Sequence, residues 1–391
     1  MRHSFYLSWQ YLVFNRIKFG ILVACVTLIA FLPLALQVLL NESEQQLRAR
    51  AVSTPLLLGS KGSALDLVMN SLYFDDEVPE LITHDAVKYL ESSGLGYAIP
   101  LYVRFEARGF PIIGTSMDYF DYRGLSLSQG QMLAMLGEAV IGAEVADRLN
   151  LKPGDSLVSS PENLFDIAGI YPLKMKIVGV LQHSNSADDR GVFVDLKSSW
   201  VIQGLGHGHV DLEKTQDNSV ILKREKGRVT ANAKLTHYTE ISAENIDSFH
   251  FHGDLGSYPL TALLVLPLDT KSGTLLRGRY LEDEHYQLTR PAEVVDGLME
   301  NIFRIKYVID AVVIIVGLTT GLAVILVFIL SLRLRQAEIS TIFRMGGSRM
   351  TLVQMLTAEI LIIMMVSALL NILLLSLVSI YSNDLVRVLI F

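Results

Sequence analysis

The chain is poor in cysteine and lacks the short motifs of the common catalytic and nucleotide-binding sites. Cys25 is the only cysteine among 391 residues, so no disulfide can form within the chain. No GxxxxGK[ST], GxSxG or HExxH sequence is present, so the signatures of a phosphate-binding loop, a serine hydrolase and a zinc protease are missing. With 40 acidic and 33 basic residues, the chain also lacks the positive charge typical of nucleic-acid-binding proteins. We therefore predict a non-catalytic protein that takes any energy for work from another chain and does not bind nucleic acid.

Charge is missing from three long stretches of the sequence, residues 19–40, 311–332 and 360–381. Each stretch is about as long as the ~20 residues that cross the hydrocarbon layer of a bilayer. The mean hydropathy of +0.39 is correspondingly high. We predict a membrane protein whose α-helical transmembrane region has three spans, at residues 19–40, 307–332 and 352–381. The first span lacks a small-residue cleavage site and is long for a signal peptide, so we interpret it as a retained anchor.

The charges outside these stretches are distributed unevenly, and this predicts an orientation. Residues 41–306 carry a net charge of −11 and the rest of the chain carries +4, which together make the overall −7. Because cytoplasmic loops are enriched in Lys and Arg, the N-terminus and residues 333–351 are expected in the cytoplasm. The acidic block 41–306 and the short tail 382–391 are then expected outside it.

Within the acidic block, strand-like and helix-like segments alternate. GYAIPLYVRF, KMKIVGVLQ, RGVFVDL and TALLVLPLD are apolar, β-branched runs bounded by turn residues, as in strands. DAVKYLESSG, GAEVADRLN and RPAEVVDGLMENI are typical of helices. The pattern predicts a large α+β extracytoplasmic domain inserted between spans 1 and 2.

Two amphipathic segments flank the spans. Residues 1–18 predict a short elbow helix on the cytoplasmic leaflet, before the first span. Ahead of the second span, apolar residues recur at steps of three and four, which predicts a helical stalk at the ends of the domain. Ordinary packing of a pre-membrane helix explains the same spacing and stays an alternative. The stalk residues are Val295, Leu298, Ile302 and Ile305.

Residues 333–351 form a charged island between two apolar runs. A short helix, a Gly-Gly break and a new helix beginning after Ser348 are predicted here, because glycine favours helix ends and serine favours helix starts. Such an element could receive force from a cytoplasmic partner, whereas a plain positive-inside loop would explain only the arginines. The candidate coupling residues are Arg335, Glu338, Ile339, Arg344, Gly346, Gly347 and Arg349.

Three segments resemble parts of one family of membrane proteins. Residues 140–155 and Ile177-Val178-Gly179-Val180 resemble the periplasmic core domain of MacB-like ABC transporter permeases. AEI at 337–339, RMGGSR at 344–349 and Glu359 resemble a cytoplasmic segment of the MacB/FtsX/LolC (type VII) permeases. SFYLSWQYLVFNRIKFGILV is similar to the N-terminal elbow of that family. The resemblance covers nearly the whole chain.

This resemblance implies the permease subunit of a MacB-type ABC transporter in the bacterial inner membrane, with its large domain in the periplasm. It implies a homodimer, contact with membrane lipid, an ABC ATPase subunit that holds ATP and Mg²⁺, and a periplasmic adaptor or substrate-binding protein as a further candidate partner. ATP hydrolysis would then move the periplasmic domain (mechanotransmission) to export or extract a substrate. An FtsX-like regulator of a periplasmic partner, or a zinc-linked transport module, is the alternative.

One feature departs from the family pattern, because these permeases usually have a fourth span. Here only ten residues, 382–391, follow the third predicted span. We expect a three-span variant with its C-terminus outside the cytoplasm; a truncated fourth span is the alternative.

Histidines gather in the second half of the acidic block. His207 and His209, and likewise His250 and His252, have the H-x-H spacing with which two imidazoles can share a Zn²⁺ or Cu²⁺ ion. His183 lies upstream of them, and Asp188 and Asp189 follow it five and six residues later. Surface histidines without a ligand are the competing interpretation. The candidate metal-binding residues are His183, His207, His209, His250 and His252.

Overall fold

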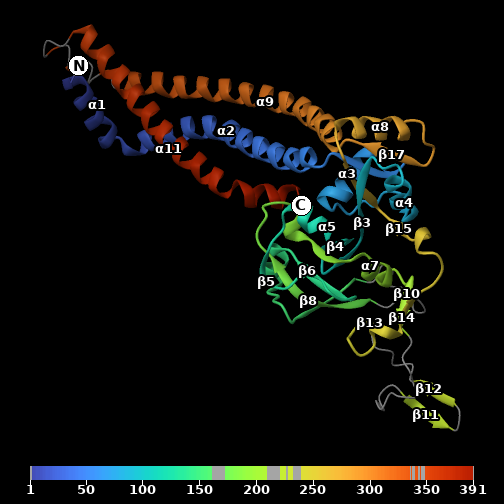
Figure 1. Cartoon of the computed structure of the whole chain (residues 1–391). Coiled ribbons are helices and arrows are strands. Elements are labelled where there is room, and N and C mark those ends of the chain that lie inside the picture. Colours follow the sequence, from blue (N-terminus) through green and yellow to red (C-terminus); the bar gives the residue numbers. More distant parts are fainter. Residues whose placement is uncertain are drawn as a thin grey trace. The chain divides into compact units, whose positions relative to one another are not determined.

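The computed structural model describes residues 2–160, 172–208, 221–225, 228–231, 239–334, 336, 340–341, 344 and 348–390 (Figure 1). The chain divides into two compact units. We call residues Leu47–Asp296 the sheet unit, and Met1–Gln46 together with Gly297–Phe391 the helical unit. The sheet unit falls inside the acidic block 41–306.

The sheet unit contains a mixed β-sheet of eleven strands. These are β1 (Leu56–Ser60), β3 (Gly96–Ala107), β4 (Phe110–Thr115), β5 (Leu127–Gly130), β6 (Glu138–Ile141), β7 (Ser156–Val158), β8 (Leu173–Leu181), β9 (Val192–Asp195), β13 (Thr239–Glu240), β16 (Ala262–Pro267) and β17 (Tyr286–Thr289). Their order is β13-β8-β6-β9-β4-β3-β16-β1-β17, and β5 and β7 also pair with β8. β4 with β9, and β8 with both β6 and β13, are parallel pairs; the other pairs are antiparallel.

Three two-stranded ribbons accompany this sheet. β2 (Ile82–Thr83) pairs with β15 (Pro259–Leu260), β10 (Gly206–Gly208) with β14 (Phe249–Phe251), and β11 (Ile221–Glu225) with β12 (Arg228–Ala231). The helices of the unit are α3 (Ala64–Tyr73), α4 (Asp85–Glu91), α5 (Asp118–Arg123), α6 (Ala143–Leu149), α7 (Leu196–Ile202) and α8 (Thr270–Tyr280), with 3₁₀ turns η1 (Ala187–Arg190), η2 (Ile246–Ser248) and η3 (Leu255–Ser257).

The prediction of an α+β domain is confirmed. The strand-like sequences GYAIPLYVRF, KMKIVGVLQ, RGVFVDL and TALLVLPLD lie on β3, β8, β9 and β16. All four residues of β6 are buried, as are the first three of β9, so these strands carry apolar side chains on both faces, which explains their continuous apolar runs. The predicted helix GAEVADRLN is α6, and Asn150 ends it in the left-handed conformation that favours glycine and asparagine.

The helical unit consists of α1 (Arg2–Phe14), α11 (Arg349–Ile390) and the larger parts of two further long helices, α2 (Arg16–Ser53) and α9 (Pro291–Leu334). α1 packs on α11, where the Ser8 hydroxyl donates to the Met355 carbonyl at 2.9 Å. Leu12, Val23, Ile362 and Ile363 form a buried apolar cluster. Residues 1–18, predicted as one elbow helix, contain α1, which ends at Phe14, and the start of α2 at Arg16. The position of α1 on the cytoplasmic leaflet stays a prediction.

Within the described residues, two helices are long and apolar enough to cross a membrane, Arg16–Ser53 and Val353–Tyr381. A shorter apolar stretch, Asp310–Thr319, lies on α9. The three-span topology therefore stays a prediction, as does the position of the tail 382–391.

Candidate functional site

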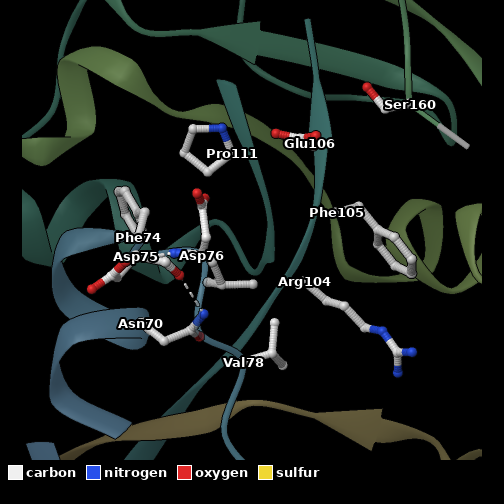
Figure 2. Close-up of a pocket in the computed structure, with 11 residues that line it drawn as sticks. Asn70, Phe74, Asp75, Asp76, Val78, Arg104, Phe105, Glu106, Pro111 and Ser160 are labelled. Carbon is white, nitrogen blue, oxygen red and sulfur yellow. Dashed lines mark hydrogen bonds between the residues drawn. The ribbon is translucent and has the colours of Figure 1, made fainter. Parts of the chain in front are cut away.

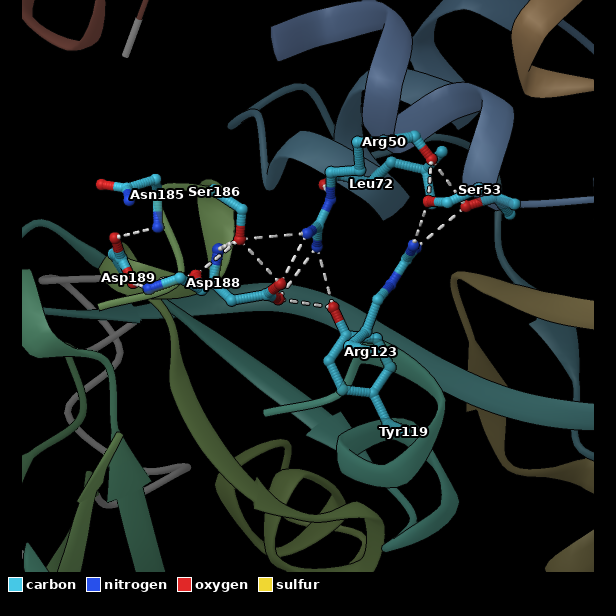
Figure 3. A network of polar contacts seen from close by, with 11 residues as sticks. Arg50, Ser53, Leu72, Tyr119, Arg123, Asn185, Ser186, Asp188 and Asp189 are labelled. Atoms are coloured by element: carbon cyan, nitrogen blue, oxygen red, sulfur yellow. Dashed lines mark hydrogen bonds and ion pairs between the residues drawn. The ribbon is translucent and has the colours of Figure 1, made fainter. Parts of the chain in front are cut away.

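The last turns of α2 belong to the sheet unit and carry a buried arginine. Arg50 donates from Nη1 to Asp188 Oδ2 at 2.5 Å and from Nη2 to Asp188 Oδ1 at 2.9 Å, a bidentate ion pair (Figure 3). Nη2 also donates to the Tyr119 hydroxyl at 2.8 Å, and that hydroxyl donates to Asp188 Oδ1 at 2.7 Å. Nε donates to the carbonyl of Leu72, in the last turn of α3. We call Arg50, Tyr119 and Asp188 the helix anchor.

The anchor is shielded from solvent, which sets its electrostatics. The side chains of Arg50 and Asp188 are only 7% and 2% exposed. Burial alone would raise the pKa of the Asp188 carboxyl, but the charge of Arg50 and the hydrogen bonds from Arg50 and Tyr119 outweigh it and hold this pKa below its usual value. Burial likewise raises the pKa of the Tyr119 hydroxyl. At neutral pH the anchor is thus a charged pair held by a neutral phenol.

A second arginine and a tyrosine hold the end of α2 from outside the anchor. Arg123 donates to the Ser53 hydroxyl at 3.1 Å and to the Thr54 hydroxyl at 3.0 Å. Tyr73 donates to the carbonyl of Leu47, and burial raises the pKa of this phenol to about 12. The Ser53 and Thr54 hydroxyls donate to the carbonyl of Arg50 at 2.9 and 3.0 Å. Carbonyls that a helix end leaves without intrahelical partners are satisfied in this way.

Asp188 is positioned by a tightly built turn, Ser184 to Gly191. Asp189 accepts hydrogen bonds from the backbone and hydroxyl of Ser184, at 2.7 and 2.8 Å, and from the Asn185 backbone at 3.0 Å. Gly142, at the start of α6, packs so closely on this turn that a Cβ would lie 2.4 Å from the Asp188 carbonyl oxygen. The VIG sequence and the SADDRG sequence therefore fit together as one unit that presents the Asp188 carboxylate to α2.

Three of the predicted metal-binding histidines come together. Ligand nitrogens of His207, His250 and His252 all lie within 4.8 Å of one another. His183 lies apart from them, with Nε2 3.3 Å from Asp147 and Nδ1 3.7 Å from Asp189. His209 falls outside the described residues. Metal binding by these histidines stays a prediction.

The sheet unit also contains a cavity of about 350 Å³ between the end of α3 and strand β3 (Figure 2). Asn70 donates to the Asp75 carbonyl at 2.8 Å at one side of it. Its charged lining combines three carboxylates, those of Asp75, Asp76 and Glu106, with the guanidinium of Arg104. This mixture of charges does not select one class of ligand.

Most of the predicted coupling residues lie outside the described part of the chain, namely Arg335, Glu338, Ile339, Gly346 and Gly347. Arg344 is described as helical and exposed, and Arg349 is the first residue of α11. All four stalk residues lie on α9; Val295 is fully buried and Leu298 partly buried, whereas the side chains of Ile302 and Ile305 are not described. Their proposed roles stay predictions.

No sequence pattern marks Arg50, Tyr73 or Tyr119 as a functional residue. Arg50 lies in ESEQQLRARAV, which has the composition of an ordinary solvent-exposed helix. One signal was available, because Leu47 and Ala51 place an apolar stripe beside Arg50 and both are buried. Asp188 is 138 residues away in sequence, so its pairing follows only from the fold.

A comparison with models of known protein families matches residues 20–235 to the MacB-like periplasmic core domain. This match spans more than half of the chain. The chain belongs to the MacB-like periplasmic core domain family. The resemblance stated from the sequence is thereby confirmed, and both the anchor and most of the large sheet lie within the matched residues.

Solved structures that this chain matches include the periplasmic region of MacB from Actinobacillus actinomycetemcomitans. It is 12% identical, with 63% of this chain and 93% of that chain covered and a TM-score of 0.35. The extracellular domain of the noncanonic ABC-type transporter YknZ from Gram-positive bacteria is 11% identical, with 60% and 98% covered and a TM-score of 0.32. A search of the curated proteins found no match.

Proposed function

We propose that this MacB-like chain is the permease subunit of an ABC transporter, and that a separate ATPase moves its sheet unit by force passed along helices. The observation that supports the proposal is the helix anchor. α2 is one helix from Arg16 to Ser53, and its apolar part is long enough to cross a membrane. Its last turn is held in the sheet unit by the buried Arg50–Asp188 pair.

To pass force to the sheet unit, α2 needs a fixed attachment there, and the helix anchor provides one. A buried pair that loses one partner leaves an uncompensated charge at a cost of about 3–5 kcal/mol, so partial rupture is strongly disfavoured. Bidentate geometry and the Tyr119 hydroxyl also fix the direction of the Arg50 side chain. A displacement of α2 would therefore be passed to η1, and from there to the sheet.

The first turns of α9, the second long helix that joins the two units, are also held in the sheet unit. α9 begins within that unit at Pro291, where Val295 is fully buried. Arg48 of α2 and Asp296 of α9 form an ion pair at 3.3 Å, with both side chains about half exposed. Such an exposed pair contributes little energy, but it couples the two helices where they enter the unit.

In this proposal ATP and Mg²⁺ are held by the partner ATPase, which binds residues 333–351 on the cytoplasmic side of a bacterial inner membrane. The chain acts as a homodimer, with the sheet unit in the periplasm meeting an adaptor or a substrate-binding protein. Energy reaches the substrate through motion of the sheet unit. In the proposed mechanism the export or extraction step takes place on the periplasmic side. In the competing mechanism the substrate passes between the spans.

The test measures whether nucleotide moves the sheet unit relative to the helical unit. In a Cys25→Ser background, spin labels at Phe14→Cys and Leu281→Cys report the distance between the units, because both side chains are highly exposed, 87% and 79%. In the complex with its ATPase, a non-hydrolysable ATP analogue should shift the distance distribution. The double variant Arg50→Met with Asp188→Leu should lose or broaden that shift while ATP hydrolysis continues.

A matched control removes a different ion pair of the sheet unit. Lys174 and Glu240 pair at 2.9 Å with side chains 25% and 50% exposed, so Lys174→Ala should leave the shift intact. Identical distance distributions with and without nucleotide would contradict the proposal. In a separate assay, Glu338→Ala with Arg344→Ala should weaken ATPase binding; unchanged binding and unchanged turnover would remove the coupling role from residues 333–351.

A further inference from the structure

The ribbon formed by β10 and β14 has two chemically different faces. In its register Gly206 lies opposite Phe251, His207 opposite His250, and Gly208 opposite Phe249. Because side chains alternate along strands, His207 and His250 share one face, and the two phenylalanines occupy the other. A Cβ on Gly206 or on Gly208 would lie 2.6 Å from a phenylalanine ring, so the rings cover both glycines. One face is thus closed by aromatic packing, and the other presents imidazoles.

A third imidazole joins the histidine face from the residue after β14. The ring centroids of His207, His250 and His252 are separated by 4.6 to 4.9 Å. Their candidate ligand nitrogens lie within 4.8 Å of one another, whereas ligands of a tetrahedral Zn²⁺ with Zn–N bonds near 2.05 Å lie about 3.3 Å apart. His207 and His252 are exposed and His250 is partly buried, so rotation of these side chains can close the difference.

The backbone around the three imidazoles is held in place by contacts beneath them. The Tyr258 hydroxyl lies 2.7 Å from the His252 carbonyl and 3.3 Å from the Leu205 carbonyl, so it spans the two histidine-bearing segments. Tyr258 is itself buried, with the Trp200 ring edge-on at 5.0 Å. Nδ1 of His250 lies 3.2 Å from the Ser248 carbonyl; as a donor to it, Nδ1 leaves the Nε2 lone pair for a metal.

We propose that His207, His250 and His252 bind one transition-metal dication of the Zn²⁺ class, on the surface of the sheet unit. Three neutral imidazoles are a donor set that such ions prefer over Ca²⁺ or Mg²⁺, which require oxygen ligands. Three protein ligands leave the fourth tetrahedral position to water or to a donor from another molecule. The proposal does not depend on how the chain couples to ATP.

The test uses the full chain, purified in detergent with an affinity tag that contains no histidine and stripped of metal with a chelator. Zn²⁺ is titrated against a chromophoric competitor, since Zn²⁺ has no redox chemistry to complicate the measurement. One Zn²⁺ per chain is expected. Each single variant, His207→Ala, His250→Ala or His252→Ala, should weaken binding at least about tenfold, and the triple variant should abolish it.

Two further variants separate ligation from general structure. His285→Ala removes an exposed histidine elsewhere on the sheet unit and should leave the affinity within about twofold of wild type. Tyr258→Phe keeps the buried ring but removes the hydroxyl between the two segments, and should weaken Zn²⁺ binding about tenfold. Co²⁺ in place of Zn²⁺ should give the intense visible absorption of a four-coordinate ion in wild type, and the triple variant should lose it.

The expected stabilisation gives an independent measurement. Zn²⁺ at 100 times its dissociation constant should stabilise the wild-type fold by a 100-fold shift of the unfolding equilibrium, and should leave the triple variant unchanged. Absence of stoichiometric Zn²⁺ binding by wild type would overturn the proposal. So would a triple variant that keeps wild-type affinity, or an equal loss of affinity in His285→Ala.

Discussion

The sheet unit and the helical unit are built from the same apolar residue types, but they expose them to opposite degrees. Leu57, Leu58 and Phe193 in the sheet unit are 0% exposed, whereas Leu32 on α2 and Leu369 on α11 are 65% and 62% exposed. In the sheet unit the apolar side chains of strands and helices cover one another. In the helical unit many of them point outward, apart from the buried cluster that includes Val23 and Ile362, and lipid or another protein chain has to cover them. An apolar sequence therefore indicates that the side chains are covered, but it does not show whether the same unit, lipid or another protein chain covers them.

The two units also differ in the polar groups that they bury. The sheet unit buries a full ion pair, Arg50 with Asp188. In the helical unit, the Ser367 hydroxyl of α11 donates to the Val23 carbonyl of α2 at 3.3 Å, and Asn371 donates within α11 to the Ser367 carbonyl at 2.9 Å. Hydrogen bonds like that from Ser367 hold helices together in membranes, where the hydrophobic effect does not drive them together. The side chain of Glu359 on α11 is buried as well.

Breaking the helix anchor should have the largest effect. Arg50→Ala leaves the Asp188 carboxylate buried without its partner, and should destabilise the sheet unit by about 3–5 kcal/mol. In a Trp9→Phe background the only tryptophan left is buried Trp200 of the sheet unit, so its fluorescence reports the unfolding of that unit alone. The double variant Arg50→Met with Asp188→Leu should recover much of the loss. A loss below 1 kcal/mol in Arg50→Ala would show that the pair is not held as described.

Matched truncations compare the two apolar surfaces directly. Leu58→Ala creates a cavity in the core of the sheet unit and should cost about 2–5 kcal/mol. Leu32→Ala in detergent should cost less than about 0.5 kcal/mol, because its side chain contacts no closed core. Chemical denaturation followed by Trp200 fluorescence measures the first value, and circular dichroism of the long helices measures the second. An equal loss in the free energy of unfolding for the two variants would show that the two apolar surfaces do not differ as described.

Lysine at two exposed leucines should distinguish lipid from water. Leu32 and Leu281 are 65% and 79% exposed. Leu32→Lys places a charge in the predicted first span, and should disfavour membrane insertion by about 2.5–3.5 kcal/mol. Leu281→Lys, on the sheet unit, should leave insertion and folding unchanged. The fraction of each variant recovered in membranes gives the comparison, and normal insertion of Leu32→Lys would argue against a membrane-spanning α2.

Acidification should weaken the anchor gradually. Because the pKa of Asp188 is lowered in the folded chain, its stabilisation is complete above the unfolded pKa of about 3.9 and is lost as pH falls through the lower folded value. The free energy of unfolding should lose at most about 1.4 kcal/mol per pH unit through this one group. The difference between wild type and Asp188→Asn should be constant from pH 8 to pH 5 and shrink below about pH 4. A difference that changes near pH 6.5 would point to a histidine instead.

Patterns within single segments were sufficient to predict many elements of the fold. The runs on β3, β8, β9 and β16 follow from β-branched and apolar residues between turns, and α6 coincides with the predicted helix GAEVADRLN. The boundary between α1 and α2 was missed, since residues 1–18 are uniformly compatible with helix and the break at Asn15 has no proline or glycine to mark it.

Hydropathy, charge and residue periodicity are local properties, so they are sufficient to predict apolar helices of membrane-spanning length before and after an acidic α+β domain in the sequence. Contacts between distant residues are not local and follow only from the fold. Arg50 reaches Asp188 across 138 positions, and His207 faces His250 across a ribbon register. Such contacts depend on strand pairing and on the close approach at glycines such as Gly142, Gly206 and Gly208. An arginine on a polar helix becomes an anchor, and three histidines become a candidate metal site, only when the fold brings their partners to them.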